Sequence, residues 1–225
     1  MSLTYQEVFE ACQLFNDLPN TFNREWLHAK KFYDWQNLCD LPEKEIRDRN
    51  LKFLNQWSSH IKKTPEVIQG IKQAHKDTRE HLHALMPITL WDLNFDDTIQ
   101  INGETNSVKD SIYYIFMRFT DVGYHLREVA SSKILHHIHP NLFIMWDNKI
   151  MSAYGVKRNP SQYVNVFMPL MKVKLNQVID SYMKDFKVDR DEAIKKMNTH
   201  VPHKTMVKLL DEYNWINYTY FSRTP

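Results

Sequence analysis

The stretch Ser131–Ile150, SSKILHHIHPNLFIMWDNKI, changes character twice along its length. Its first part has apolar residues at helical spacing, and Pro140 ends that helix because a proline cannot continue one. The apolar run NLFIMW then predicts a short, buried, extended ribbon. Asp147 follows at once, where its carboxylate can cap the next helix, NKIMSAY. The stretch therefore predicts a helix, a buried ribbon and a second helix in direct succession.

Helix start signals recur on both sides of this stretch. TYQE at Thr4–Glu7 is a capping box, and TPEV at Thr64–Val67 places a proline in a first turn, where its missing N–H costs nothing. Apolar residues follow these starts at spacings of three and four. We expect helices over residues 4–17, 22–37, 43–60, 64–86, 107–122, 124–139, 147–154, 160–186, 189–198 and 203–214.

Residues 88–103, ITLWDLNFDDTIQING, are the exception. This segment is β-branched and aromatic, lacks a helical period and ends in Asn102-Gly103, so we expect a long connection with a short hairpin. The whole chain has only 4 glycines, which argues against a many-stranded β protein. The prediction is one all-α globular domain, residues 1–225, with lobes at 1–87 and 104–225 joined by the segment 88–103.

Composition limits the function classes. With 43% hydrophobic and 25% charged residues, the chain is typical of a folded, water-soluble protein. The formal charge of +2 permits binding to DNA without indicating it. The 2 cysteines are too few for a disulfide framework or a cysteine zinc cluster. We expect a cytoplasmic protein with no membrane partner, because neither a signal-peptide pattern nor an apolar run of about 18 residues occurs.

The histidines of Ser131–Ile150 have two interpretations. His136 and His139 share a helix face, while His137 points elsewhere. Histidine near a helix end interacts favourably with the last carbonyls, so packing or capping is the first interpretation. A histidine-based metal site is the alternative, although no HExxH or paired Glu-x-x-His pattern accompanies these residues. We favour packing and expect no metal ligand and no cofactor.

Asp147 also has two interpretations. It lies where the buried ribbon meets a helix start, which suits an N-cap. The same position suits a catalytic carboxylate whose environment tunes its proton affinity. Trp146 beside it, and Tyr154 further on, would then form part of a pocket.

Basic residues near Asp147 are candidates for contacts with phosphate. Lys133 could pair with an acid or bind a phosphate, and Lys157 and Arg158 precede a helix start at Asn159 that favours anions. With Lys149, these side chains would form a nucleic-acid-binding face if they lie on one side of the molecule.

The pattern Ser-Lys-x-Leu-His, a proline and then Phe-Ile-Met-Trp-Asp resembles a block of all-helical bacterial proteins. More remotely, it resembles the core of the helix-hairpin-helix DNA glycosylase superfamily, in which a catalytic aspartate opens the helix after an apolar segment. Asp147 holds that position. The family hairpin, Leu-Pro-Gly-Val/Ile-Gly, is represented only by TDVGYHL at Thr120–Leu126, and Asn148 and Lys149 replace the threonine and histidine that follow the family aspartate.

The resemblance implies a cytoplasmic protein with a glycosylase-like core that binds or repairs DNA. Asp147 would stabilise the cationic sugar or activate water, Lys133 or Arg158 would hold phosphate, and Trp146 or Tyr154 would contact the extruded base. Two alternatives remain at this point. One is a non-catalytic helical module that binds a protein partner or small ligand, and the other is the histidine-based metal-binding protein.

Overall fold

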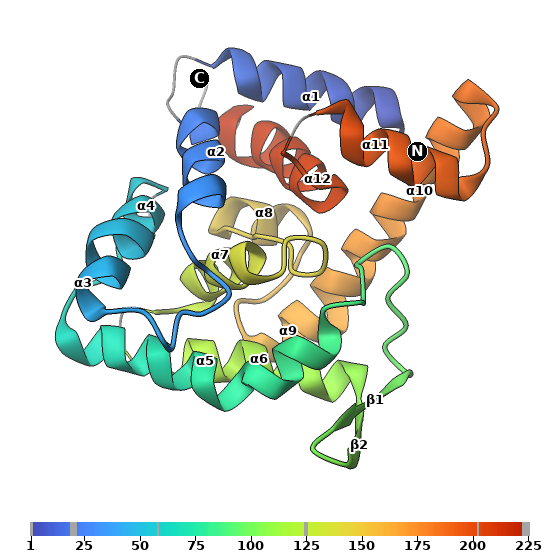
Figure 1. Ribbon diagram of the computed structural model, residues 1–225. Helices are drawn as coiled ribbons and strands as arrows, with labels where there is room; N and C mark the ends of the chain where they lie inside the picture. The colour runs from blue at the N-terminus through green and yellow to red at the C-terminus, as the bar shows by residue number, and fades with distance from the viewer. Residues whose placement is uncertain (1, 19–21, 58, 124–125, 202, 222–225) are drawn as a thin grey trace.

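A computed structural model describes residues 2–18, 22–57, 59–123, 126–201 and 203–221. It is mostly helical, as expected (Figure 1). The helices are α1 (Tyr5–Asp17), α2 (Phe22–Phe32), α3 (Glu43–Glu45), α4 (Leu51–Gln56), α5 (Pro65–Leu85), α6 (Val108–Thr120), α7 (Glu128–Ile138), α8 (Asn148–Ala153), α9 (Pro160–Gln162), α10 (Met168–Phe186), α11 (Arg190–His200) and α12 (Met206–Trp215). Single π-helical turns join or extend some of them: η1 (Ile46–Asn50), η2 (Tyr163–Phe167) and η3 (Ile216–Tyr220).

The helix starts follow the sequence signals. Thr4 and Glu7 form the capping box of α1, and Pro65 occupies the first turn of α5. The side chains of Ser107, Asn159 and Asp189 each accept a backbone N–H at the start of a helix. Local side-chain chemistry therefore sets where these helices begin.

Several predicted helix ends were wrong. The helix predicted over 22–37 ends at Phe32, because the Asp34 carboxylate accepts the backbone N–H groups of Gln36 and Asn37 at 3.0 and 3.1 Å and holds a turn there. The helix predicted over 124–139 begins at Glu128, and residues 124–125 of that prediction lie outside the described residues. The helix predicted over 203–214 begins after its cap, Thr205, and continues into η3.

The expected hairpin lies at the end of the irregular segment. Strands β1 (Thr98–Ile101) and β2 (Glu104–Ser107) pair antiparallel, with Ile101 opposite Glu104. Asn102 and Gly103 make the turn with φ of 52° and 84°, the left-handed conformation that these two residue types tolerate best. β2 leads directly into α6. The hairpin lies at the lower edge of the molecule in Figure 1.

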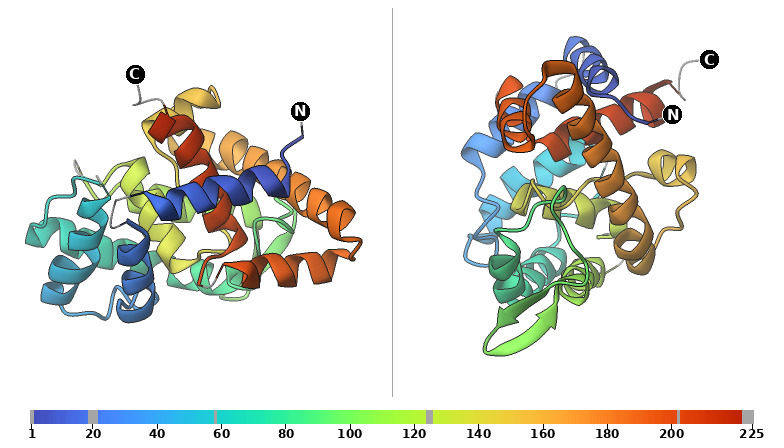
Figure 2. Two further views of the ribbon diagram at one scale, coloured as in Figure 1. Left: turned by 90° about the horizontal axis from the view of Figure 1, so that it is seen from above. Right: turned by 90° about the vertical axis from the view of Figure 1, so that its right-hand side faces the viewer.

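The core is continuous across the predicted boundary at 88–103. Most buried apolar side chains, from Leu3 to Leu210, belong to one large cluster, and a small second cluster holds Ala11, Phe15, Leu18 and Ile216. Helix α5 packs on α6, and α1 packs on α12, so helices before the irregular segment contact helices after it on two sides. In Figure 1, α7 and α8 lie in the middle, with α1 above and α5 below. Figure 2 shows α1 crossing α12 when the molecule is seen from above.

Candidate functional site

The ribbon that leads to Asp147 is buried, and side chains from α7 and η2 donate hydrogen bonds to it. Leu142 to Trp146 are each at most 3% exposed. The His136 ring donates its Nδ1–H to the carbonyl of Phe143 at 2.6 Å, and the Tyr163 hydroxyl donates to the carbonyl of Ile144 at 2.7 Å. These bonds satisfy ribbon carbonyls that lack strand partners, and they fix the chain just before Asp147.

The histidines of α7 and its end are packing residues in this structure. His136, His137 and His139 are all buried, and burial lowers the pKa of each, that of His136 to about 3. His137 stacks on Trp35 with ring centroids 4.4 Å apart, and His139 Nε2 donates to the carbonyl of Leu85 at 2.9 Å. Within the described ranges, no group of three His, Cys, Asp or Glu side chains is arranged to hold a metal ion.

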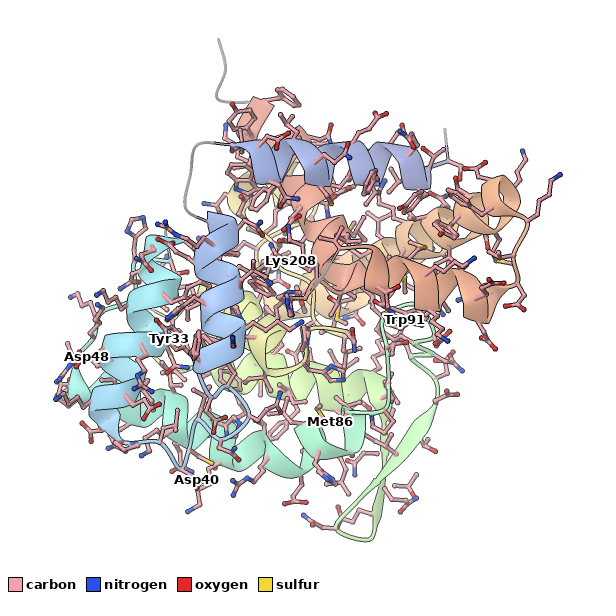
Figure 3. All side chains as sticks on the ribbon, turned by 45° about the horizontal axis from the view of Figure 1, so that its top comes forward. Tyr33, Asp40, Asp48, Met86, Trp91 and Lys208 are labelled. Carbon is pink, nitrogen blue, oxygen red and sulfur yellow. The ribbon has the colours of Figure 1, made fainter. Side chains whose placement is uncertain are left out.

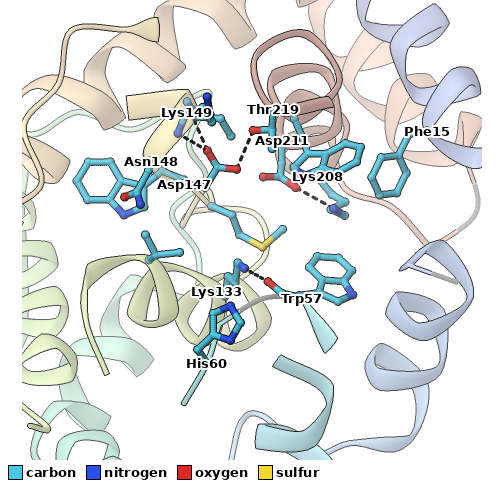
Figure 4. Close-up of a pocket in the computed structure, with 15 residues that line it drawn as sticks. Phe15, Trp57, His60, Lys133, Asp147, Asn148, Lys149, Lys208, Asp211 and Thr219 are labelled. Carbon is cyan, nitrogen blue, oxygen red and sulfur yellow. Dashed lines mark hydrogen bonds and ion pairs between the residues drawn. The ribbon is translucent and has the colours of Figure 1, made fainter. Parts of the chain in front are cut away.

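Asp147 is the N-cap of α8. Its Oδ1 accepts the backbone N–H groups of Lys149 and Ile150 at 2.8 and 2.9 Å. Its Oδ2 accepts the Thr219 hydroxyl at 2.7 Å (Figure 4). The carboxylate therefore fixes the start of α8 and ties it to η3, while one edge of the residue remains open to a pocket.

That pocket has a volume of about 420 Å³ and lies where α7, the ribbon, α8, α12 and η3 meet (Figure 4). Its volume falls within the range of small-molecule sites. Aromatic side chains make much of its wall: Phe15, Trp57, Trp146 and Trp215. Val129, Met145 and Ile150 add aliphatic surface, and the remaining lining side chains are polar or charged: His60, Lys133, Asp147, Asn148, Lys149, Lys208, Asp211 and Thr219.

Lys133 enters this pocket from α7. Its ammonium group donates a hydrogen bond to the carbonyl oxygen of Trp57. Burial lowers the pKa of Lys133 to about 8, although the negative charges of Asp211 and Asp147 oppose that shift. The pocket therefore brings together a carboxylate and an amine that is easily deprotonated. The sequence analysis had singled out both residues, but for separate roles.

Lys204, Lys208, Asp211 and Glu212 form a buried ionic cluster, of which Lys208 and Asp211 line the pocket. The Lys208 ammonium lies 2.8 Å from Asp211 and 3.6 Å from Glu212, and Lys204 lies 2.8 Å from Glu212. Figure 3 shows Lys208 inside the molecule. Its ammonium also lies 4.8 Å from the ring centres of both Trp26 and Trp57, close enough for cation–π attraction.

Charges within the ionic cluster shift one another's proton affinity. Burial lowers the pKa of Lys208, but the Asp211 and Glu212 carboxylates raise it more, so that pKa lies above its usual value. Burial raises the pKa of Asp211, although Lys208 opposes the change. The sequence analysis missed this cluster. The available signal was KLLDE at 208–212, which places a lysine three and four residues before two acids on a helix.

The remaining predicted site residues lie in different surroundings. Trp146 lines the pocket and donates its indole N–H to the carbonyl of Glu128 at 3.1 Å. Lys149 lines the pocket and is exposed.

Tyr154 is not a lining residue, and its hydroxyl donates to Asn214 Oδ1 at 2.6 Å. Lys157 and Arg158 are also outside the lining and exposed, and Arg158 pairs with Glu128 at 2.8 Å.

The turn that the resemblance assigns to the family hairpin follows α6. Gly123 has φ of 105°, and the backbone N–H of Leu126 donates to its carbonyl at 3.1 Å. Tyr124 and His125, the next two residues of that turn, lie outside the described residues.

Comparison with known proteins adds no family assignment. No family model matches the chain, and no curated protein or solved structure is significantly similar to it. The resemblance to the helix-hairpin-helix glycosylases therefore depends on the residues quoted above. In the described part of the chain, no helix is long and apolar enough to cross a membrane.

Proposed function

We propose that this protein acts on DNA as a base-excision enzyme and that the pocket between α7, α8 and α12 receives the extruded nucleotide. The observation that carries the proposal is the presence of Lys133 and Asp147 in one pocket of about 420 Å³. A carboxylate and an amine of lowered pKa in one concave site are a combination that favours catalysis.

The two side chains suit two stages of that reaction. As a base leaves the sugar, positive charge develops at the sugar carbon, and the nearby Asp147 carboxylate would stabilise it. The Lys133 amine would then attack the same carbon and form a Schiff base with the abasic sugar. With a pKa of about 8, roughly one Lys133 in ten is uncharged at pH 7 and able to attack.

The pocket wall suits an extruded base. Trp57, Trp215 and Phe15 lie on the wall and offer apolar ring surfaces. Lys149 and His60, both exposed, also line the pocket, where basic groups would contact phosphates beside the extruded nucleotide.

The test is covalent trapping. Wild-type protein incubated with a DNA duplex that contains an abasic site, in the presence of sodium cyanoborohydride, should give a stable protein–DNA adduct. The Lys133→Gln variant should give none. Lys184→Gln, which changes an exposed lysine on α10, is the matched control and should trap like the wild type.

A salt titration provides the second measurement. Affinity for the same duplex should fall steeply as the salt concentration rises, because neutralised phosphates release counterions. If the wild type forms no adduct and its binding shows no salt dependence, the DNA proposal is wrong.

The other candidate function is a non-catalytic module that binds a small ligand in the same pocket. The observation that favours it is the full use of the Asp147 carboxylate, whose oxygens accept two backbone N–H groups and one hydroxyl. A cap of this kind explains the aspartate without catalysis. Adduct formation that depends on Lys133 would decide against this second candidate.

A further inference from the structure

The pocket has a second carboxylate, Asp211, which comes from α12. We propose that Asp211 is the proton acceptor for Lys133, taking the proton that the amine must lose before it attacks an aldehyde carbon. This inference rests on the proposed function, in which Lys133 is the nucleophile. It gives Asp147 and Asp211 different roles, the first a fixed negative charge and the second a proton carrier.

The hydrogen bonds of the two carboxylates differ. Both oxygens of Asp147 are occupied, by Lys149, Ile150 and Thr219. Asp211 uses Oδ2 for Lys208 at 2.8 Å, and no hydrogen bond to its Oδ1 is found within the described ranges. A proton can therefore bind Asp211 Oδ1 without breaking an existing bond, whereas protonation of Asp147 would disturb a helix cap or the tie to η3.

The charges around Lys133 also favour Asp211. From α12, Asp211 and Lys208 face the pocket, and from the start of α8 come Asp147 and Lys149. His60 lies on the loop after α4, and His137 on α7 itself is kept uncharged by burial.

Of the two carboxylates, Asp211 has the larger effect on the pKa of Lys133. Burial also raises the pKa of Asp211, which makes it a better base than an exposed aspartate.

The Lys133 ammonium gives one proton to Asp211, and the nitrogen lone pair forms a bond to the aldehyde carbon while the carbonyl electron pair moves to oxygen. The proton held by Asp211 and one remaining proton on nitrogen pass to that oxygen, which leaves as water. The product is a protonated imine, so that one ammonium and one aldehyde become one iminium and one water.

Formaldehyde with sodium cyanoborohydride tests this step without DNA. Each Schiff base at Lys133 is reduced to a methylated lysine, which mass spectrometry of the digested protein measures. Lys184 in the same sample shows how an exposed lysine reacts at each pH. In the wild type, methylation of Lys133 should rise with pH around a midpoint near 8.

Asp211→Asn should change two features of this profile. The midpoint should move to lower pH, because a negative charge that holds the proton on Lys133 is lost. The rate at high pH should fall about tenfold or more, because the proton carrier between nitrogen and oxygen is missing. A merely structural effect would move the midpoint in the opposite direction, toward the ordinary lysine value near 10.4, as water entered a loosened pocket.

Two further variants control for the loss of a buried charge. Glu212→Gln breaks the same ionic cluster but does not line the pocket, and it should retain the wild-type rate at high pH. The double variant Lys208→Met, Asp211→Asn removes the pair together, which leaves no uncompensated charge from that pair. It should show the same loss of rate as Asp211→Asn. A wild-type rate in Asp211→Asn or in the double variant would overturn the proposal.

The two proposals fail differently. If Lys133 is methylated with the expected dependence on Asp211 but abasic DNA is not trapped, the role of Asp211 stands as a property of the pocket and its aldehyde substrate is not DNA. If DNA is trapped through Lys133 and Asp211→Asn behaves like the wild type, the DNA function stands and the role of Asp211 is wrong.

Discussion

The Thr219 hydroxyl donates a hydrogen bond of 2.7 Å to the carboxylate of Asp147, and this bond joins η3 to the first turn of α8. The contact links residues that are 72 positions apart in the chain. It also orients the carboxylate beside the pocket, because the other oxygen is already held by two backbone N–H groups. The position of the Asp147 carboxylate is therefore fixed both by the first turn of α8 and by Thr219 of η3.

Asp147→Asn separates the cap from the charge. Asparagine is as good an N-cap as aspartate, so the melting temperature should stay close to that of the wild type. Base excision should be lost, because the negative charge beside the sugar is gone. Trapping of abasic DNA should persist, because the base has already left and Lys133 is unchanged. The measurements are thermal unfolding, release of the base and adduct yield.

The Asp147→Ala variant is the companion experiment, since alanine removes both the charge and the cap. It should lower the free energy of unfolding by about 1–2 kcal/mol. If the asparagine variant excises the base as well as the wild type does, Asp147 acts as a helix cap alone.

Thr219→Val tests the tie between η3 and α8. Valine keeps the shape of threonine but cannot donate to Asp147, so we expect a loss of roughly 1–2 kcal/mol in the free energy of unfolding by denaturant. The α8 cap remains, and the carboxylate should become more mobile, which would lower the rate of base excision without abolishing it. An unchanged excision rate would show that the two backbone bonds orient Asp147 sufficiently by themselves. Thr199→Val, at an exposed threonine that bonds only within α11, is the matched control.

Acid should destabilise the protein through its buried histidines. The pKa of His136 is about 3 in the folded state and near 6.5 in the unfolded state. The stability that goes with this difference is fully present above pH 6.5 and is lost as the pH falls from 6.5 toward 3, because only the unfolded chain binds the proton. The free energy of unfolding should therefore fall by about 1 kcal/mol per pH unit for this residue alone.

The measurement is denaturant unfolding between pH 6.5 and 5, a range chosen to lie above most carboxylate titration. The glutamine of His136→Gln can still donate to the Phe143 carbonyl. Because it binds no proton, the free energy of unfolding of this variant should change less steeply with pH, by about 1 kcal/mol per pH unit. His28→Gln, at an exposed position, should leave that slope unchanged. An equal slope in the wild type and in His136→Gln would contradict the burial argument.

The sequence predicted helix starts and turns better than it predicted which helices contact one another. The capping box at Thr4, the proline start at Pro65 and the Asn102-Gly103 turn are each determined by a few neighbouring residues, and all three are present. The end of α2 was missed because the Asp34 turn competes with the helix, and spacing alone does not reveal that competition.

The site was predictable only in part. The ribbon before Asp147 was expected to be buried, and it is, because its apolar run has no polar alternation. Lys133 was predicted to hold a phosphate near Asp147. Its burial in the pocket, which lowers its pKa, was not predicted, because that burial depends on how α7 packs. Asp211 was missed for the same reason. It reaches the pocket from α12, and no local signal places that helix beside α7.

Removing one charge of the ionic cluster should destabilise the protein more than removing two opposite charges together. Asp211→Asn leaves Lys208 buried at 0% exposure with its nearest partner gone, at 3.6 Å from the remaining Glu212 carboxylate. Removing one member of a buried pair costs about 3–5 kcal/mol, because the other charge is left uncompensated. The double variant Lys208→Met, Asp211→Asn removes both charges and keeps an apolar chain between Trp26 and Trp57, so most of that loss should be regained. Denaturant unfolding of the wild type, both single variants and the double variant forms a complete cycle. Additive losses would mean that the two side chains do not interact in solution, and the 2.8 Å ion pair would then contribute nothing to the stability of α12.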